Sequence, residues 1–397
     1  MKNTINLIIV IFVLSQIDLL SGCKNFSSQN NNNKIKIIVG AENTNEYLPT
    51  LTNKKVAIVA NQSSYIKHTH IVDSLLSLNI NVVKIFAPEH GLRGAADAGE
   101  HINNNIDKQT GIPIISLYGK NKKPQSEDLQ NIDIIIFDIQ DVGVRFYTYI
   151  STMHYVMEAC AENNIDFLVL DRPNPNGFLV DGPVLDTNFR SFVGMHKVPM
   201  VYGMTIGEYA LMINGEGWLK NNEKCKLKVI KCKNYTHQTL YNLPIKPSPN
   251  LPNMKSVNLY PSLGLFEGTV VSVGRGTNFP FQVIGHPDFK NNNFSFMPKS
   301  IMGAAKNPKF KNVKCFGLDL RNMKIDNSKI NLNLLISAYR NLNIGDKFFN
   351  PYFKNLAGNN ILRQQIIDQL SEKEIRKTWK KDLLTFKKIR KKYLLYK

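Results

Sequence analysis

The sequence lacks the short motifs that mark several large enzyme classes. No glycine-rich dinucleotide fingerprint follows the first expected strand, and no phosphate-binding loop ending in Lys-Ser or Lys-Thr occurs. A nucleophile elbow of the form GxSxG is absent, and so is an HExxH zinc pattern. The sequence therefore gives no support to a nucleotide-dependent enzyme, a serine esterase or a zinc protease.

Cysteine is scarce, with five in 397 residues and no CxxC spacing. Cys225 and Cys232 flank an expected strand, so a disulfide and two buried free thiols both stay open. The one His-x-His pair, His68 and His70, is expected at the start of a helix as a solvated pair. We therefore expect no metal site and no cofactor.

Acidic residues are outnumbered, and the formal net charge is +19. Lysine supplies 40 of the 50 basic residues, with many of them near the C-terminus. No basic-aromatic repeat or recognition-helix pattern accompanies this charge, so nucleic acid is not an expected partner. Attraction to anionic polymers of a cell envelope is compatible with it.

The N-terminus has the order of a bacterial lipoprotein leader. A positive start precedes an apolar stretch, and Leu20-Ser21-Gly22 then places small residues before Cys23. We expect residues 1–22 to be a signal peptide, Cys23 to be lipidated, and residues 23–34 to be a flexible tether. The expected location is the cell envelope, with the protein exported and held at a membrane by its lipid. The oligomeric state is left open.

Short apolar runs alternate with segments of helical periodicity, which predicts an α/β fold with a mostly parallel, Rossmann-like sheet. Helices are expected at 69–77 and 149–162, and a further one after Thr205, which forms a capping box with Glu208. The expected strands are residues 36–39, 55–60, 81–86, 112–117, 133–139, 166–170 and 226–231.

A proline-rich passage at 243–252 predicts the crossing between two domains, because proline fits neither a central strand nor a helix interior. We expect a Rossmann-like domain at 35–245 and a smaller α+β domain at 246–397. The tail at 372–397 alternates apolar residues with lysines and is expected to form a solvated amphipathic helix.

The loop at 86–100 is the richest polar segment of the chain. It follows a predicted buried strand and combines Glu89, His90, Arg93 and Glu100 with three glycines. Ligands bind at the carboxyl ends of strands in such sheets, so this loop predicts one wall of a site. A glycine-punctuated turn with solvated charges is the plainer alternative.

Four more polar segments follow strands or turns, and their amides, carboxylates, arginines and aromatic rings are typical of a carbohydrate site. Glycosyl hydrolysis typically needs a carboxylic acid that protonates the leaving oxygen. Glu89 fits that role best, followed by Glu267, and then by Glu100 and Asp141. Each could instead serve an ion pair or a loop cap. Arg93, Arg145, Arg172 and Arg275 could grip an acidic substituent, although Arg145 and Arg172 could also brace Asp141 and Asp171.

Several motifs together resemble the exo-β-N-acetylmuramidase, or NamZ-like, family. They are FAPEHGLRGAADAGE, SLYG, DIQDVGVRFYTY, DRPNPNG with DGP, YGMTIGEYA, PSPNLP, YPSLGLFEGT and GRGTNFPFQVIGHP. The resemblance runs from about residue 36 to the end of the chain and is densest between Phe86 and Pro287. It implies a Rossmann-like domain, a smaller C-terminal domain and a cleft at their junction.

The resemblance also implies exo-hydrolysis that releases N-acetylmuramic acid from the non-reducing ends of peptidoglycan fragments. Glu89 corresponds to the family's APEHG glutamate, and Tyr147 is a second catalytic or positioning group. The lactyl carboxylate of muramic acid gives the arginines a ligand. A muropeptide-binding lipoprotein without turnover, and an esterase or deacetylase on the same sugars, are the alternatives. The predicted substrate-binding residues are His90, Arg93, Glu100, Asp141, Arg145, Arg172, Asn174, Arg275, Asn278 and His286.

Overall fold

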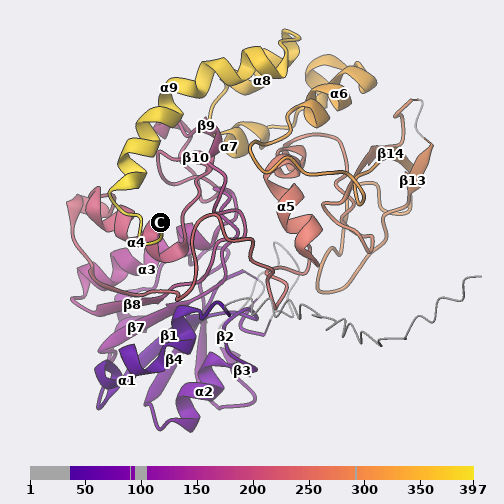
Figure 1. Cartoon of the computed structure of the whole chain (residues 1–397). Coiled ribbons are helices and arrows are strands. Elements are labelled where there is room, and N and C mark those ends of the chain that lie inside the picture. Colours follow the sequence, from indigo (N-terminus) through magenta and orange to yellow (C-terminus); the bar gives the residue numbers. More distant parts are fainter. Residues whose placement is uncertain (1–35, 90, 94–104, 291–292) are drawn as a thin grey trace, which may run out of the picture. The chain divides into compact units, whose positions relative to one another are not determined.

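A seven-stranded sheet forms the centre of the N-terminal part (Figure 1). The computed structural model describes residues 36–89, 91–93, 105–290 and 293–397, and Ile37–Lys397 form one compact unit. Six strands run parallel, and a short edge strand is antiparallel. In sheet order they are β11 (Lys226–Ile230), β8 (Asp166–Leu170), β7 (Ile134–Asp138), β1 (Val56–Ala60), β4 (Val82–Ala87), β6 (Pro113–Ser116) and β5 (Asn105–Ile106).

The six parallel strands have the doubly wound order 3-2-1-4-5-6 when they are numbered along the chain. In β1, Val56, Ile58 and Ala60 pack on one face, and Ala57 and Val59 pack on the other. Successive strand side chains point to opposite faces, so a strand that is buried on both faces reads as one apolar run. The predicted α/β fold with a mostly parallel sheet is confirmed.

Helices cover both faces of this sheet. The core on one face includes side chains of α1 (Thr44–Leu51) and α2 (Ile71–Ser77). The core on the other face includes side chains of α3 (Tyr149–Glu162) and α4 (Ile206–Gly215). The predicted capping box at Thr205 and Glu208 is present and begins α4.

A smaller set of elements forms the C-terminal part. A three-stranded antiparallel sheet has the order β12 (Val283–His286), β14 (Cys315–Asp319) and β13 (Phe294–Phe296). A large core packs much of this part against the hairpin of β9 (Asp181–Val184) and β10 (Pro199–Val201). The helices are α5 (Met254–Leu263), α6 (Asn333–Leu342), α7 (Phe353–Ala357), α8 (Ile361–Ile367) and α9 (Glu372–Lys391), together with the 3-10 helix η5 (Gly264–Gly268).

The lysine-rich tail forms the predicted amphipathic helix, α9, but its apolar face is buried and not solvated. Ile375 and Trp379 are buried in the C-terminal core, and Phe386 is buried in the core beside α3 and α4. Arg376 forms an ion pair with Asp181 at 2.5 Å. The lysines occupy the outer face only, so α9 joins the two cores.

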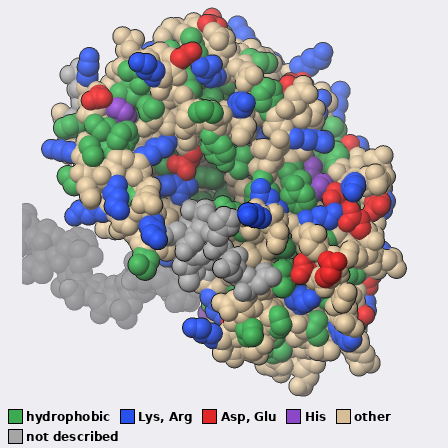
Figure 2. Space-filling view, turned by 180° about the vertical axis from the view of Figure 1, so that it is seen from behind, with side chains coloured by type: hydrophobic (Ala, Val, Ile, Leu, Met, Phe, Trp, Pro, Cys, Tyr) green, Lys and Arg blue, Asp and Glu red, His purple; other side chains and the backbone are tan. Residues whose placement is uncertain are grey.

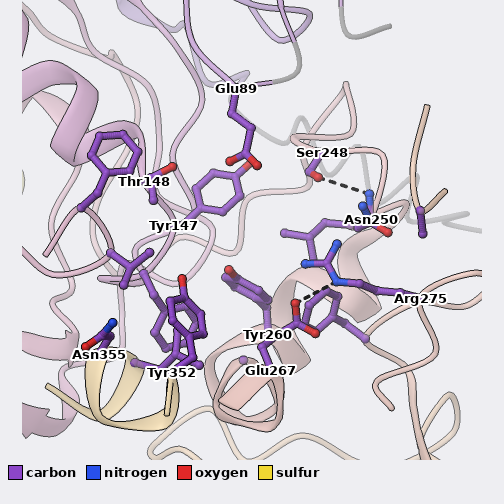
Figure 3. A pocket seen from close by; sticks show the side chains of 18 of the residues that line it. Glu89, Tyr147, Thr148, Ser248, Asn250, Tyr260, Glu267, Arg275, Tyr352 and Asn355 are labelled. Carbon is purple, nitrogen blue, oxygen red and sulfur yellow. Dashed lines mark hydrogen bonds and ion pairs between the residues drawn. The ribbon is translucent and has the colours of Figure 1, made fainter. Parts of the chain in front are cut away.

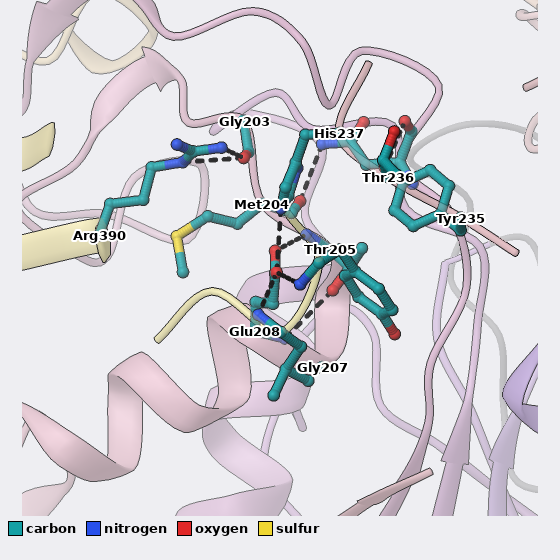
Figure 4. A network of polar contacts seen from close by, with 12 residues as sticks. Gly203, Met204, Thr205, Gly207, Glu208, Tyr235, Thr236, His237 and Arg390 are labelled. Atoms are coloured by element: carbon teal, nitrogen blue, oxygen red, sulfur yellow. Dashed lines mark hydrogen bonds and ion pairs between the residues drawn. The ribbon is translucent and has the colours of Figure 1, made fainter. Parts of the chain in front are cut away.

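The end of α9 and the residues after it complete this junction, and we call Arg390, Leu395 and Tyr396 the C-terminal clasp. Arg390 Nε donates to the Gly203 carbonyl at 2.9 Å (Figure 4). The Leu395 amide donates to Glu208 Oε1 at 2.7 Å. The Tyr396 hydroxyl donates to Asp171 Oδ2 at 2.5 Å. The chain end therefore satisfies buried carboxylates of the N-terminal part.

Three other predictions are corrected or decided by the structure. Residues 36–39 contribute a single bridge, Ile38 to Lys233, and no strand. His70 is buried and hydrogen-bonded to the Asn61 carbonyl, so the prediction of a solvated pair is wrong for this residue. His68 is exposed, as predicted. Cys225 and Cys232 are both free and buried, which decides between the disulfide and the thiols.

Two surface properties bear on function. On the face shown in Figure 2, lysine and arginine side chains are spread out and interleaved with acidic ones, without gathering into one patch. Within the described ranges, no helix combines the length and apolarity needed to cross a bilayer.

Candidate active site

A cavity of about 940 Å³ opens where the carboxyl ends of β4, β6 and β7 meet η5 of the C-terminal part (Figure 3). Its lining mixes carboxylates, an arginine, several tyrosines and small polar groups, which is the composition of a site for a polar ring ligand. The lining residues used below are Glu89, Tyr118, Tyr147, Thr148, Ser248, Asn250, Tyr260, Gly264, Glu267, Arg275, Phe281, Lys309 and Tyr352.

Glu89 lies two residues beyond the end of β4, and its carboxylate points into the cavity (Figure 3). Tyr118, two residues beyond the end of β6, hydrogen-bonds to it. Burial, and then the charge of Glu89, raises the pKa of the Tyr118 hydroxyl. The hydroxyl therefore stays protonated and donates a hydrogen bond to the Glu89 carboxylate. Two neighbouring strand ends thus place a carboxylate and its phenol partner together.

Aromatic rings form one wall of the cavity. The Tyr147 ring meets Tyr149 edge-on at 4.9 Å and Tyr260 at 6.0 Å, and Tyr260 meets Phe281 at 5.0 Å. The Tyr147 hydroxyl donates to the Pro247 carbonyl at 2.7 Å. Burial raises the pKa of Tyr147 well above its usual value, so Tyr147 is a neutral phenol at physiological pH.

Glu267 and Arg275 form an ion pair on the opposite wall. Arg275 Nε lies 2.9 Å from Glu267 Oε2, and the guanidinium carbon lies 5.0 Å from the centre of the Phe281 ring. Arg275 Nη1 has no hydrogen-bond partner among the described residues. Burial lowers the pKa of Arg275, but the Glu267 carboxylate more than offsets this, and the pKa is raised overall. The pair places a guanidinium, fixed by its carboxylate partner, in the cavity wall.

Lys309, which also lines the cavity, fixes the backbone around Glu267. Lys309 Nζ donates to the Thr269 carbonyl at 2.6 Å and to the carbonyls of Phe266 and Glu267 at 3.2 and 3.3 Å. Gly264 lets this segment approach the turn before α3, because a Cβ there would lie 2.2 Å from the Phe146 ring. The η5 segment is therefore fixed against both parts of the fold.

Four predicted site residues lie outside the cavity lining and are buried. Arg145 donates to four carbonyls, those of Pro183, Val198, Leu356 and Ala357, at 2.8–3.0 Å. Arg172 pairs with Asp138 at 2.6 Å, so neither arginine braces the aspartate that the sequence suggested. Asp141 accepts from the Tyr202 hydroxyl and the Gly143 amide, and Asn174 donates to the Met204 carbonyl. These contacts support the walls from behind.

The other predicted residues are distributed as follows. Arg93 pairs with Asp107 at 2.9 Å and Asp73 at 3.3 Å, away from the cavity lining. Asn278 is exposed, and His286 lies in β12 beside Asp288; neither lines the cavity. His90, Glu100 and Cys23 lie outside the described residues. Glu89, Tyr147, Glu267 and Arg275 are the predicted residues that the structure brings together.

Sequence reasoning missed several lining residues. Tyr118 lies in SLYG, which was read only as a motif of the family resemblance. Ser248 and Asn250 lie in PSPNLP, which was read as part of the crossing between domains. Tyr352 comes from the start of α7, far along the chain, and nothing in its local sequence points to a site. Within the described chain, no three His, Cys, Asp or Glu side chains are grouped to hold a metal ion.

Comparison with known proteins decides the family. Residues 56–255 match the family described as exo-beta-N-acetylmuramidase NamZ, N-terminal, and residues 258–396 match its C-terminal counterpart. The chain belongs to the NamZ family. The two matches meet between residues 255 and 258, close to the predicted crossing at 243–252.

Individual relatives cover nearly the whole chain. The peptidoglycan beta-N-acetylmuramidase NamZ of Bacillus subtilis (strain 168) is 38% identical over 374 residues, which are 88% of this chain and 89% of that protein. A crystal structure of a DUF1343 family protein from Bacteroides fragilis has a TM-score of 0.85 and 52% identity, and covers 91% of this chain and 99% of that one. A second such B. fragilis protein has a TM-score of 0.78 and 31% identity, with 91% and 100% covered.

Proposed function

We propose that this protein is an exo-acting glycoside hydrolase that releases N-acetylmuramic acid from the non-reducing ends of peptidoglycan fragments, in cell-wall turnover. One observation carries the proposal: Glu89, the family's motif glutamate, points into a cavity large enough for a sugar and lined by tyrosines. The B. subtilis relative, named for this activity, aligns with almost the entire chain.

In this proposal Glu89 is the general acid that protonates the leaving glycosidic oxygen. The Tyr118 hydroxyl, hydrogen-bonded to it, orients the carboxyl group. Tyr147 is held neutral, with its hydroxyl engaged by the Pro247 carbonyl, so it positions the sugar ring rather than attacking it. The edge-on aromatic wall supplies the apolar surface on which a pyranose packs.

Arg275 is the proposed ligand of the lactyl carboxylate of muramic acid. Of the four arginines that the sequence singled out, it lines the cavity and the other three do not. Its side chain is partly exposed in the cavity lining, and a guanidinium is suited to grip a carboxylate with two donors. Glu267, ion-paired through Arg275 Nε, holds the guanidinium in place in this proposal.

A matched pair of variants tests the assignment of Glu89. Glu89→Gln should lower turnover of a chromogenic β-N-acetylmuramide by about 10²- to 10⁴-fold, the usual contribution of a general acid. Glu127→Gln, on an exposed 3-10 helix, is the control and should keep wild-type turnover. Release of free N-acetylmuramic acid should be followed by chromatography, with folding checked by circular dichroism.

The outcomes separate the competing functions. No release of sugar by wild type would overturn the hydrolase and favour a muropeptide-binding protein. A product with an altered acyl group and an intact glycosidic bond would favour the esterase or deacetylase. Near-normal turnover by Glu89→Gln would move the acid role to another carboxylate, with Glu267 next in line.

We also propose that the protein is exported and anchored to the envelope by a lipid on Cys23. The support is the order of the leader: a positive start, an apolar stretch and small residues before the cysteine. Metabolic labelling with a fatty-acid analogue should mark the wild-type protein in the membrane fraction and leave Cys23→Ser unlabelled. Equal labelling of both would contradict the anchor.

A further inference from the structure

A second cavity, of about 640 Å³, adjoins the site cavity. Lys122, Ser191 and Phe192 line both of them, so the two cavities meet along this short wall. Ser191 and Gly194 form an antiparallel bridge, and Ser151 Oγ donates to the Phe192 carbonyl at 2.7 Å. The shared wall is therefore a tight turn fixed to α3.

Aromatic rings line the second cavity as well. Tyr155 and Phe192 stack nearly parallel, with centroids 6.3 Å apart and planes at 13°. The Trp218 indole stacks on His196 at 4.7 Å and 16°. Tyr155, Phe192 and Trp218 are each only partly buried. The second cavity thus offers ring surface to a ligand, as the first one does.

The polar groups behind these rings have their partners inside the protein. His196 lies between the Tyr209 hydroxyl and His154, at 3.0 Å from each. Glu158 accepts from Lys123 Nζ at 2.7 Å and from the Lys220 amide at 3.0 Å. The carboxylate in the lining is neutralised by these donors.

Positive side chains remain at the edge of the second cavity. Arg190 and Lys220 line it and are exposed, and Lys122 Nζ lies 4.6 Å from the centre of the Phe192 ring. Ring surface next to cations suits a sugar chain that carries carboxylates.

We propose that the second cavity binds the glycan units on the leaving side of the bond that is cut. This rests on the proposed function, which places the terminal muramic acid in the first cavity. The chain must then leave that cavity, and the wall of Lys122, Ser191 and Phe192 leads into a space of the size and lining typical of a sugar site. Arg190 and Lys220 would face the carboxylates of the muramic acid units further along.

Two substrates of different length test this. An aryl β-N-acetylmuramide has no sugar on the leaving side, whereas a peptide-free glycan chain of about six sugars fills both cavities. The double variant Arg190→Glu/Lys220→Glu should lower kcat/KM for the long chain at least about tenfold, since a reversed charge repels its carboxylates. Turnover of the aryl substrate should stay at the wild-type value, because neither residue lines the first cavity.

Matched variants keep the test decisive. Lys380→Glu/Lys381→Glu makes the same charge change on the exposed face of α9 and should leave both substrates unaffected. Trp218→Leu removes ring surface and should also lower kcat/KM for the long chain alone. If it does not fold, the charge variants still decide, because Arg190 and Lys220 are exposed.

Each result has one meaning. Loss on the long chain alone supports the subsite. Equal loss on both substrates, or no loss on the long chain, overturns it while the proposed function stands. Wild-type protein that cuts neither substrate overturns the proposed function, and the subsite with it.

Discussion

The cleft and the buried polar residues outside its lining use the same residue types in opposite ways. We call these buried residues the frame: Asp138, Asp141, Arg145, Asp171, Arg172 and Asn174. In the frame, Arg145 gives its donors to four carbonyls and Arg172 is paired to Asp138. In the cleft, Arg275 is partly exposed, lines the cavity and is ion-paired to Glu267. An arginine buried away from the cavity stabilises the fold, and one that is partly exposed in the cavity lining is available to a ligand.

The largest expected effect is a loss of stability on substitution in the frame. Arg172→Met should cost roughly 3–5 kcal/mol of unfolding free energy, because it leaves the fully buried Asp138 carboxylate without its cation. Urea unfolding followed by circular dichroism measures it. The double variant Arg172→Met/Asp138→Asn removes the charge as well and should recover part of the loss. A change below about 1 kcal/mol for Arg172→Met alone would contradict the role given to the pair.

In the cleft, we expect a substitution to lower activity strongly and stability only slightly. Arg275→Ala should cost less than about 1 kcal/mol in stability, since its ion pair is partly exposed. It should lower kcat/KM on a β-N-acetylmuramide by roughly 10- to 150-fold, the equivalent of about 1.5–3 kcal/mol for a charged hydrogen bond. On an otherwise identical β-N-acetylglucosaminide, which lacks the lactyl group, Arg275→Ala and wild type should have the same kcat/KM. Arg340→Ala, on the outer surface, is the control.

A smaller effect is expected where the C-terminal clasp meets the frame. Tyr396→Phe removes the hydroxyl that donates to Asp171 and accepts from the Cys232 amide, and it should cost about 1 kcal/mol. The melting temperature should fall, while turnover per folded molecule stays unchanged. Tyr393→Phe removes a hydrogen bond to Glu216 near the surface and should cost less. A loss of turnover in Tyr396→Phe at full stability would break the division between frame and cleft.

The smallest effect concerns acid stability. The hydrogen bond from His154, together with Lys123 and the Lys220 amide, lowers the pKa of Glu158 to about 2. Its stabilisation is therefore complete above its unfolded pKa, near 4.5, and is lost as the pH falls toward 2. Glu158→Gln should be less stable than wild type at pH 6, and the difference should shrink as unfolding is measured at pH 4 and then pH 3. A difference that is constant with pH would contradict this.

The sheet could be predicted because its strands are buried on both faces, which makes each a short apolar run. Residues 133–139 and 166–170 were read in this way, and β7 and β8 lie there. Helix α3 matched its predicted bounds, because its apolar spacing continues without interruption to Glu162. The strand predicted at residues 36–39 is absent, because only Ile38 of this apolar segment pairs with a neighbouring segment, at Lys233.

The site could be predicted only in part. A polar residue at a strand end can either stabilise the fold or bind a ligand. The local sequence does not reveal whether backbone carbonyls or a ligand will accept its hydrogen bonds. Arg145 and Arg275 differ in this respect because of residues far along the chain, such as Leu356 and Ala357 for Arg145. Tyr352 reaches the cavity through the packing of α7, which no nearby motif reveals.

The C-terminal clasp also sets an order of events. Asp171 and Tyr396 are 225 residues apart, and Glu208 and Leu395 are 187 apart. Contacts between such distant residues form late, after the closure of a long loop. Until Leu395 and Tyr396 dock, Glu208 lacks two of its hydrogen-bond donors and Asp171 lacks one. Docking of the C-terminal clasp therefore completes the hydrogen bonding of the N-terminal part.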